Sequence, residues 1–350
     1  MVCSYNGAAK LVACFDALAN QQVPVEVVVV DDGSSDGTEA LARSYGFSVI
    51  RHERNKGISA ARNTGLCHAT SLVVAFCDDD CTPPSDWTMQ ILAAWDANPN
   101  ATVIGGMVEV DNPVTFTQRF LVYRNPLVPA EIALAHDPSV WYRLARQFRP
   151  PRLPETNASS VYSVVGANMS MHRSRALAAG GFDEGLVFGE GEEVSLCISV
   201  RERFGEGSVL VDPRIVLAHR FDPSMLKTWR RSFAYGRGAG ERWRKQFGWP
   251  SLPVVGPSAV VATFIALPLS WPVGVFVGLA VLATPYGFWI TRTNAKRDAS
   301  SVAFPFAALA DDLVSVLGFA RGVSGEAGKA LRPRRPESRV DGIPGRSDQE

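Results

Sequence analysis

The sequence predicts an α/β protein with a Rossmann-like, mostly parallel sheet, flanking helices and a C-terminal helical hairpin. Two observations predict the sheet. The run "VEVVVVDD" (25–32) is continuously β-branched, which is typical of a strand buried on both faces. A second apolar run, 71–77, ends in three consecutive acids, and helical patterns alternate with such strands over the first hundred residues. In such sheets ligands bind beyond the carboxyl ends of the strands, where these acids fall.

The first elements follow this alternation, with short connections between them. The segment 3–21 has the pattern of a turn and helix after a first strand, yet only Met1 and Val2 precede it, so we expect at most a stub of that strand. Further strands are expected at 25–32, 47–52, 71–77 and 101–110, and helices at 38–46, 58–69 and 86–99.

The second half of the domain is less regular. Prolines between residues 116 and 160 predict a helix followed by a long connection. Residues 161–205 predict a strand, a helix ending at Gly180-Gly181, a glycine-rich loop and a helix from about Glu192. Short strands within 208–223 and a basic, aromatic helix complete a domain that we expect to span residues 1–247.

The uncharged stretch 252–290 is about twice the roughly 20 residues that one membrane span needs. It predicts a two-helix transmembrane hairpin, and the basic residues at both flanks place residues 1–247 on the cytoplasmic side of a multi-pass membrane protein. A buried soluble hairpin is the alternative. Residues 300–323 carry Asp311-Asp312 in mid-run and predict an amphipathic interfacial helix. The tail 330–350 has the composition of a disordered segment.

Composition excludes several classes of function. The chain of 350 residues has 35 basic and 35 acidic residues, so no net charge recruits nucleic acid. Its six cysteines have no framework spacing, which indicates reduced thiols in a cytosolic domain. Cys77 and Cys81 lack a second cysteine pair for a zinc site, and we interpret them as small core side chains.

The run "VAFCDDDCTP" (74–83) places Asp78, Asp79 and Asp80 at a strand end. Adjacent carboxylates repel unless a cation is present. Mg²⁺ or Mn²⁺ is bound by one or two carboxylates with phosphate oxygens at other positions, so a D-x-D here suits a metal-bridged diphosphate. A solvated acidic turn is the alternative.

A second constellation, "DDGSSDGT" (31–38), follows the other buried strand. Gly33 permits a tight turn, and Asp36 or Thr38 suits a helix cap. Capping explains Asp36 but not Asp31-Asp32. A carboxylate at this strand end is therefore available to accept hydrogen bonds from a nucleobase or a ribose.

Five segments together resemble a family-2 inverting glycosyltransferase of the GT-A fold. They occur in the family's order over roughly residues 1–247: "CSYNGA", "VVVVDDGSSDGT", "RNKGISAARNTGL", "VAFCDDDCTP" and "GEGEEVSL". The resemblance implies a nucleotide-sugar donor and a divalent metal, Mg²⁺ or Mn²⁺. The membrane hairpin predicted over 252–290 adds the hypothesis that the acceptor is a lipid-linked or cell-envelope glycan.

The resemblance also implies roles for the matched residues. Asp32 would hold the base with the Cys3-Ser4 turn nearby, Asp80 would be the main metal ligand, and Asp78 would lie near the ribose, with Asp79 beside them. Glu192-Glu193 stand where the family has Glu-Asp, so we expect Glu193 to be the general base and Glu192 to be the second choice.

Five further residues are candidates, three of them with structural alternatives. His219 ends a predicted strand, and the resemblance implies that it could be a further metal ligand; a structural histidine is the alternative. Arg230 and Arg231 either neutralise the leaving diphosphate or form a positive membrane flank. Asn63, with Arg62, is a weaker donor-site candidate.

Two rival functions remain open on the sequence. A sugar nucleotidyltransferase would share the sheet and the metal carboxylates, but "CSYNGAAK" is a poor phosphate loop. A non-catalytic membrane scaffold that retains the fold would tolerate the short first strand and the Glu193 departure. Metal-dependent nucleotide binding separates these readings.

Overall fold

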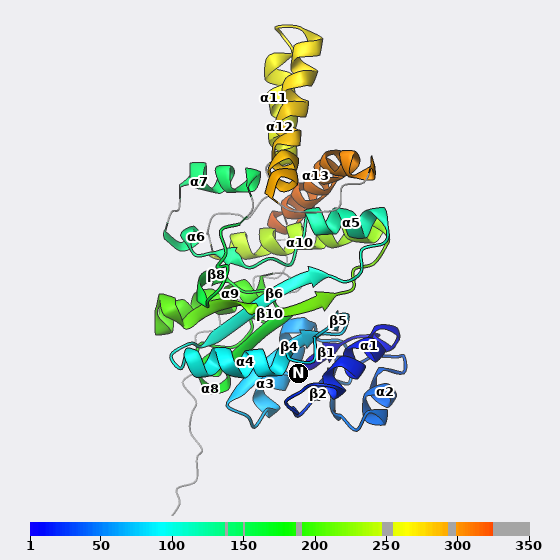
Figure 1. Cartoon of the computed structure of the whole chain (residues 1–350), viewed down its shortest axis with the longest axis vertical. Coiled ribbons are helices and arrows are strands. Elements are labelled where there is room, and N and C mark those ends of the chain that lie inside the picture. The colour runs from blue at the N-terminus through cyan, green and yellow to red at the C-terminus, as the bar shows by residue number, and fades with distance from the viewer. Residues whose placement is uncertain (137–138, 150, 187–190, 247–254, 293–298, 325–350) are drawn as a thin grey trace, which may run out of the picture.

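The computed structural model describes residues 1–136, 139–149, 151–186, 191–246, 255–292 and 299–324. These residues form a ten-stranded mixed sheet with helices packed on it and a pair of helices projecting from one end (Figure 1). The strand order is β3-β2-β1-β4-β9-β6-β10-β8-β7, with β5 paired to β10. The predicted fold class is therefore confirmed.

The N-terminal third is the predicted parallel α/β unit. Its elements are β1 (Val2–Ser4), α1 (Ala8–Ala19), β2 (Val28–Asp31), α2 (Thr38–Ser44), β3 (Ser48–Arg51), α3 (Ile58–His68) and β4 (Val73–Asp78). The first strand is the expected stub of three residues, and it pairs in parallel with both β2 and β4. Cys3 and Ser4 lie in this strand, so the prediction that they form a turn is wrong.

The central part of the sheet departs from an all-parallel pattern. The elements are β5 (Cys81–Thr82), α4 (Trp87–Ala97), β6 (Val103–Val110), β8 (Ser159–Ser163), β9 (Asn168–His172), α8 (Arg173–Ala178), α9 (Glu192–Phe204), η2 (Glu206–Ser208) and β10 (Val209–His219). β9 runs antiparallel between β4 and β6, and β8 runs antiparallel to β10. The expected short strands within 208–223 are one strand, whose pairing with β6 shifts register between Val211 and Val216.

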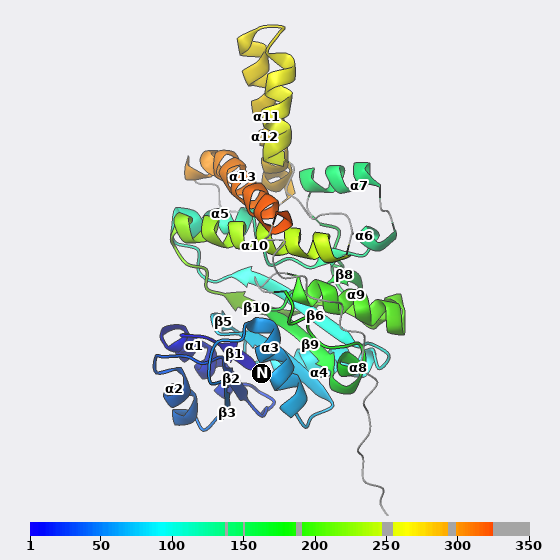
Figure 2. The ribbon, with the colours of Figure 1, turned by 180° about the vertical axis from the view of Figure 1, so that it is seen from behind.

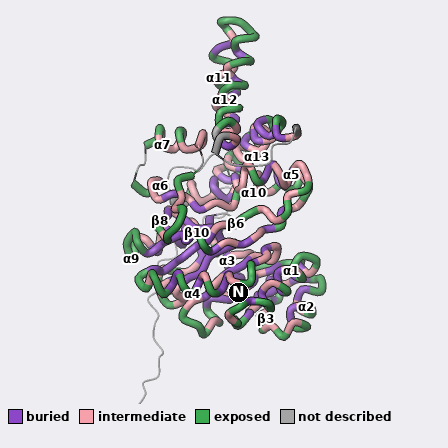
Figure 3. The backbone as a smooth tube through the Cα atoms, viewed as in Figure 1, coloured by how far each residue is buried: buried purple, intermediate pink, exposed green. Residues whose placement is uncertain are grey.

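Strand β4 shows how the core is divided between the two faces of the sheet. Val73, Ala75 and Cys77 pack with α1 and α4, whereas Val74 and Phe76 pack with α3 and α9. This alternation follows from the two-residue period of a strand. Both clusters are buried, whereas exposed residues lie in the peripheral helices and loops and along the projecting α11–α12 pair (Figure 3).

The long connection between β6 and β8 contains several short elements. These are α5 (Phe116–Tyr123), β7 (Ala130–Glu131), α6 (Ala133–His136), α7 (Val140–Ala145) and η1 (Arg146–Phe148). α5 begins with a capping box in which Thr115 and Gln118 bond each other's backbone N–H groups, which explains where the predicted helix starts.

The C-terminal part consists of helices. They are α10 (Met225–Gln246), α11 (Val255–Ala266), α12 (Trp271–Arg292), η3 (Ala299–Ala303) and α13 (Phe304–Val323). α11 and α12 lie side by side and project away from the sheet (Figures 1 and 2). Within the described part of the chain, only residues Ser300–Val323 form a helix long and apolar enough to cross a membrane. The hairpin expected over 252–290 gives two shorter apolar helices, and residues 252–254 and the tail 330–350 lie outside the described residues.

α13 packs along α10 rather than standing apart from the body. A side-chain carbon on Gly236 of α10 would lie 1.9 Å from the Ser315 carbonyl oxygen, so the two helices need glycine at this crossing. Asp312 of α13 is buried and accepts hydrogen bonds from Arg124 and from the Gly256 N–H, the latter at 2.8 Å. These bonds attach α13 both to α5 and to the start of α11.

Candidate functional site

Three strands end at one edge of the sheet and bring the predicted acids together. β1 and β4 end there at Ser4 and Asp78, and β10 ends there at His219. After β4, the chain turns through Asp79 and Asp80 into β5. This short strand pairs with the end of β10, so that Cys81 lies opposite His219. Asp80 therefore lies beside His219, although the two are far apart in the sequence.

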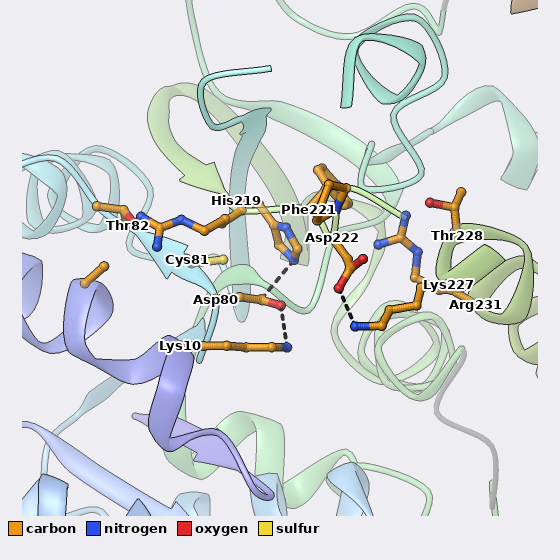
Figure 4. Close-up of a pocket in the computed structure, with 13 residues that line it drawn as sticks. Lys10, Asp80, Cys81, Thr82, His219, Phe221, Asp222, Lys227, Thr228 and Arg231 are labelled. Carbon is orange, nitrogen blue, oxygen red and sulfur yellow. Dashed lines mark hydrogen bonds and ion pairs between the residues drawn. The ribbon is translucent and has the colours of Figure 1, made fainter. Parts of the chain in front are cut away.

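Two adjoining cavities lie at this edge. One, of about 450 Å³, is lined by Lys10, Asp80, His219 and Arg231 among others (Figure 4). The other, of about 580 Å³, shares Asp80, His219 and Arg231 and extends past Asp78 to Glu193. The described residues thus form one continuous site, with the carboxylate cluster in the middle and Glu193 toward one end.

Asp80 and His219 have a geometry that fits a divalent cation. Asp80 Oδ1 lies 3.0 Å from His219 Nε2, and two ligands about 2.1 Å from an ion and at right angles would be about 3.0 Å apart. Burial opposes ionisation of Asp80, but the His219 hydrogen bond and the charges of His219 and Lys10 hold its pKa below the usual value. An ionised carboxylate beside an imidazole is a suitable donor pair for Mn²⁺ or Mg²⁺.

Cys81 is close to this pair: its sulfur and one potential ligand atom from each of Asp80 and His219 all lie within 4.8 Å of one another. Although its contact with Cys77 lowers the pKa of Cys81, burial raises it to about 11, so the group is a neutral thiol at pH 7. All six cysteines are free. Cys14, Cys77 and Cys81 are buried, as expected for core side chains.

Lys10 and Ser4 are the neighbours of the acids on the side of β1 and α1. The Lys10 ammonium lies 3.0 Å from Asp80 Oδ2 and 3.8 Å from Asp79 Oδ1. The Ser4 hydroxyl donates to Asp79 Oδ2 at 2.6 Å. Burial and then the charge of Asp80 raise the pKa of Asp79 to about 6, so a nearby cation would favour the ionised form of Asp79.

Arg62 of α3 links the acids to helix α9. Its guanidinium donates to Glu192 Oε1 at 2.6 Å and to Asp78 Oδ1 at 3.3 Å. The Arg62 and Glu192 side chains are 5% and 6% exposed. Gly166 borders this guanidinium, because a side-chain carbon there would lie 2.6 Å from it. Glu192 is therefore held by an ion pair, and its other oxygen, Oε2, is buried without a partner among the described residues.

We expect Arg62→Met to lower the free energy of unfolding by about 3–5 kcal/mol, because it leaves the Glu192 carboxylate buried without its cation. Urea unfolding monitored by circular dichroism measures the effect. The double variant Arg62→Met/Glu192→Met removes both charges and should recover most of the loss. A double variant no more stable than Arg62→Met would contradict this account of the pair.

Glu193 is the second acid in the first turn of α9 and lines the larger cavity. Burial, and then the charge of Glu192, raise the pKa of Glu193 above that of an ordinary glutamate. Gly191 precedes the pair with φ of +94°, and a side-chain carbon on it would lie 1.6 Å from the Arg242 guanidinium. Of the quoted motif "GEGEEVSL" (189–196), residues 189–190 lie outside the described residues.

One face of α10 borders the site. Arg231, Tyr235 and Arg242 line the larger cavity, and their spacing of four and seven residues places them on one side of the helix. Arg231 packs over the Phe221 ring with 4.7 Å from its guanidinium carbon to the ring centre. Arg230 is exposed and lines neither cavity, so the structure brings in only one of the two predicted arginines.

Asp32 and Asn63 lie outside both cavities, although we expected each at the donor site. The Asp32 carboxylate is buried and accepts from His52 Nδ1 at 2.6 Å and from the N–H groups of Lys56 and Gly57. The Asn63 amide bonds the backbone of Phe182. Both side chains hold loops next to the site, because short polar groups at strand and helix ends satisfy nearby backbone first.

Two further site residues, Lys10 and Arg242, were not among the predicted ones. Arg62 was predicted only as a weaker donor-site candidate, and the structure shows it as a bridge between Asp78 and Glu192. Lys10 is a lone cation in the helix after β1, where no motif marks it. Arg242 is one of several arginines in a segment that also has the composition of a membrane flank. The three adjacent acids Asp78–Asp80 were the sequence feature that could have indicated nearby cations, because such acids require positive charges from elsewhere in the fold.

Comparisons with known proteins find similarity to glycosyltransferases. Residues 1–157 match the family model described as glycosyl transferase family 2. The chain is 30% identical over 225 residues to the pre-mycofactocin glycosyltransferase of Mycobacterium tuberculosis, covering 61% of this chain and 42% of that protein. It is 29% identical over 202 residues to the glucosyl-dolichyl phosphate glucuronosyltransferase of Haloferax volcanii, covering 54% and 57%. The chain thus spans about half the length of these relatives.

A solved structure shares the fold. The mannosyltransferase PcManGT of Pyrobaculum calidifontis, in complex with GDP-Man and Mn²⁺, aligns with a TM-score of 0.54 and 16% identity, over 92% of this chain and 86% of that one.

Proposed function

We propose that the protein moves a sugar from a nucleotide-sugar donor to an acceptor hydroxyl, with inversion and with a divalent cation. The match of residues 1–157 to the glycosyl transferase family 2 model supports this proposal. The observation that carries this proposal is one continuous site holding the Asp80–His219 pair and the Glu193 carboxyl group. The Asp80–His219 pair suits the binding of a divalent cation, and the Glu193 carboxyl group suits the role of a general base.

The donor end is assigned to residues around the acids. Asp80 and His219 would hold Mg²⁺ or Mn²⁺, which when bound neutralises the diphosphate of the donor. Asp78 and Cys3 line the cavity beside them and are positioned for the nucleoside, with Asp79 and Ser4 behind. Arg231 faces the same cavity and would stabilise the charge of the leaving diphosphate.

The base end is assigned to Glu193. Its ionised carboxylate takes the proton of the acceptor hydroxyl while the hydroxyl oxygen forms a bond to the anomeric carbon. The bond from that carbon to the diphosphate oxygen breaks, and the nucleoside diphosphate leaves with the electron pair. Attack opposite to the leaving group inverts the anomeric carbon. Arg62 fixes Glu192, which places the first turn of α9 next to Asp78.

A lipid-linked or cell-envelope glycan acceptor fits the C-terminal helices. α11 and α12 project from the body and expose large apolar side chains near their connection, including Ile265, Leu269, Trp271 and Phe276. Exposed apolar surface of this extent indicates a membrane or a partner. We propose that 252–290 inserts in a membrane with residues 1–247 on its cytoplasmic side, while α13, packed along α10, stays at the interface. One relative is named for action on a glucosyl-dolichyl phosphate.

We expect Ile265→Asp/Phe276→Asp to reduce binding to phospholipid vesicles by at least about tenfold, since two charges would enter the hydrocarbon. Vesicle flotation of the full chain measures this. Leu72→Asp is the control, because Leu72 is 67% exposed but lies at the start of β4, far from the hairpin in sequence. Equal flotation of all three proteins would contradict membrane insertion of the hairpin.

A donor panel tests the function itself. Purified protein with Mn²⁺ is incubated with UDP- and GDP-sugars and with lipid-linked or soluble acceptors, and sugar transfer and nucleoside diphosphate release are measured. Diphosphate release with transfer supports the proposal. Pyrophosphate formation from a nucleoside triphosphate and a sugar phosphate would instead indicate a nucleotidyltransferase. Absence of metal-dependent UDP or GDP binding would indicate a non-catalytic scaffold.

A further inference from the structure

Lys10 occupies an unusual place among the acids of the site. It lies in the first turn of α1, and its ammonium is bound to Asp80 Oδ2 at 3.0 Å while Asp80 Oδ1 is bound to His219 (Figure 4). The same ammonium is 3.8 Å from Asp79. Lys10 thus supplies a positive charge to the carboxylate that the geometry assigns to a divalent cation.

The ion pair of Lys10 is accessible and replaceable. The Lys10 side chain is 57% exposed, and a lysine carries its charge on a flexible four-carbon stem. An exposed pair of this kind contributes little to stability. A divalent cation held by Asp80 and His219 would repel the ammonium and compete with it for the same carboxylate.

The cavity shows where a displaced ammonium would point. Lys10 lines the smaller cavity together with Arg231, whereas Glu193 lines only the larger one. A metal bound by few carboxylates completes its coordination with phosphate oxygens, so the diphosphate must lie next to Asp80 and within reach of the Lys10 side chain.

We propose that Lys10 is a displaceable counter-ion of Asp80, which a divalent cation replaces and which then binds the diphosphate of the nucleotide. This inference rests on the proposed function and adds a donor-binding residue to it. It also predicts an order of binding, because the metal has to bind Asp80 and displace Lys10 before Lys10 can contact the phosphates.

A purely structural ion pair makes the opposite prediction for metal. If Lys10 only fastened α1 to the turn at Asp79–Asp80, its removal would loosen the site and weaken both metal and nucleotide. A displaceable counter-ion gives effects of opposite sign: without Lys10 the metal has no competitor, whereas the nucleotide loses a contact.

The test uses the full chain and Lys10→Met. Mn²⁺ binding without nucleotide is titrated by the electron paramagnetic resonance signal of the free ion. UDP and GDP binding at saturating Mn²⁺ is then measured by calorimetry. We expect Lys10→Met to bind Mn²⁺ about three- to tenfold more tightly, since it removes one screened charge. We expect about tenfold weaker nucleotide binding, since it removes a charge-assisted contact.

Two variants serve as controls. Lys227→Met removes a lysine of the same cavity whose ammonium pairs with Asp222 at 2.7 Å, and it should leave Mn²⁺ affinity unchanged. Lys10→Arg keeps the charge and should keep Mn²⁺ affinity within about twofold. Circular dichroism spectra confirm that each variant folds.

Three outcomes would overturn the proposal. Unchanged or weaker Mn²⁺ binding by Lys10→Met refutes the competition, while metal-dependent transfer by the wild type would leave the proposed function standing. Tighter Mn²⁺ with unchanged nucleotide affinity refutes the diphosphate contact. A wild-type chain that binds no Mn²⁺ refutes this inference together with the metal part of the proposed function.

Discussion

Glu193→Gln is expected to lower the rate of sugar transfer by about 10²- to 10⁴-fold, the usual contribution of a positioned general base. The amide keeps the shape of the side chain but cannot take the proton of the acceptor hydroxyl. Affinities for Mn²⁺ and for the nucleotide should stay within about twofold, because these ligands are assigned to the other end of the site. Single-turnover transfer and calorimetric titration separate the two effects.

The control for this substitution is Glu202→Gln, an exposed position on the same helix, which should transfer sugar at the wild-type rate. Glu192 is the informative neighbour. If Glu192→Gln lost the same factor while Glu193→Gln kept full activity, the base would be Glu192, our second choice from the sequence.

The acidity of Glu193 adds a dependence on pH. Burial and the charge of Glu192 raise its pKa, so the base is protonated at pH values where an ordinary glutamate is already ionised. Transfer should therefore rise as the pH passes upward through this raised pKa. Removing the neighbouring charge by Glu192→Gln should move this rise in the pH–rate profile to lower pH. A rise at the same pH as in the wild type would contradict the effect of Glu192 on the pKa of Glu193.

Much of the site could be predicted because strand ends are easy to recognise and parallel strands end at one edge. The apolar run before Asp78 located β4, and the run before His219 located the end of β10. That these two ends meet at one carboxylate depends on β5, a strand of two residues that no periodicity marks. The pairing of Asp80 with His219 was thus an expectation from the family resemblance rather than from pattern.

The remaining contacts depend on how helices pack on the sheet, which local sequence does not specify. Arg62 reaches Glu192 because α3 and the start of α9 meet across Asp78, 130 residues apart in sequence. Asp32 was expected to face a nucleotide, but its carboxylate accepts hydrogen bonds from the backbone N–H groups of Lys56 and Gly57 in the loop before α3. Arg230 and Arg231 are equivalent by composition, and only the rotation of α10 decides which of them faces the cavity.

Asp80→Asn is expected to weaken Mn²⁺ binding by at least about 100-fold, because loss of partners outside the coordination shell alone costs about 10- to 100-fold. Transfer at low Mn²⁺ should fall by a similar factor and recover in part at high Mn²⁺. The matched control is Asp222→Asn, an acid of the same cavity that pairs with Lys227, which should leave Mn²⁺ affinity unchanged. Equal Mn²⁺ affinities of Asp80→Asn and the wild type would remove Asp80 from the metal site.

The same variant also connects the metal to Lys10. In the Asp80→Asn background the ammonium has lost its closest carboxylate, so adding Lys10→Met should change Mn²⁺ affinity much less than it does in the wild type. The two substitutions should therefore be non-additive, as expected for residues in direct contact. Additive effects on Mn²⁺ affinity would mean that Lys10 acts on the metal through a group other than Asp80, for which Asp79 at 3.8 Å is the nearest candidate.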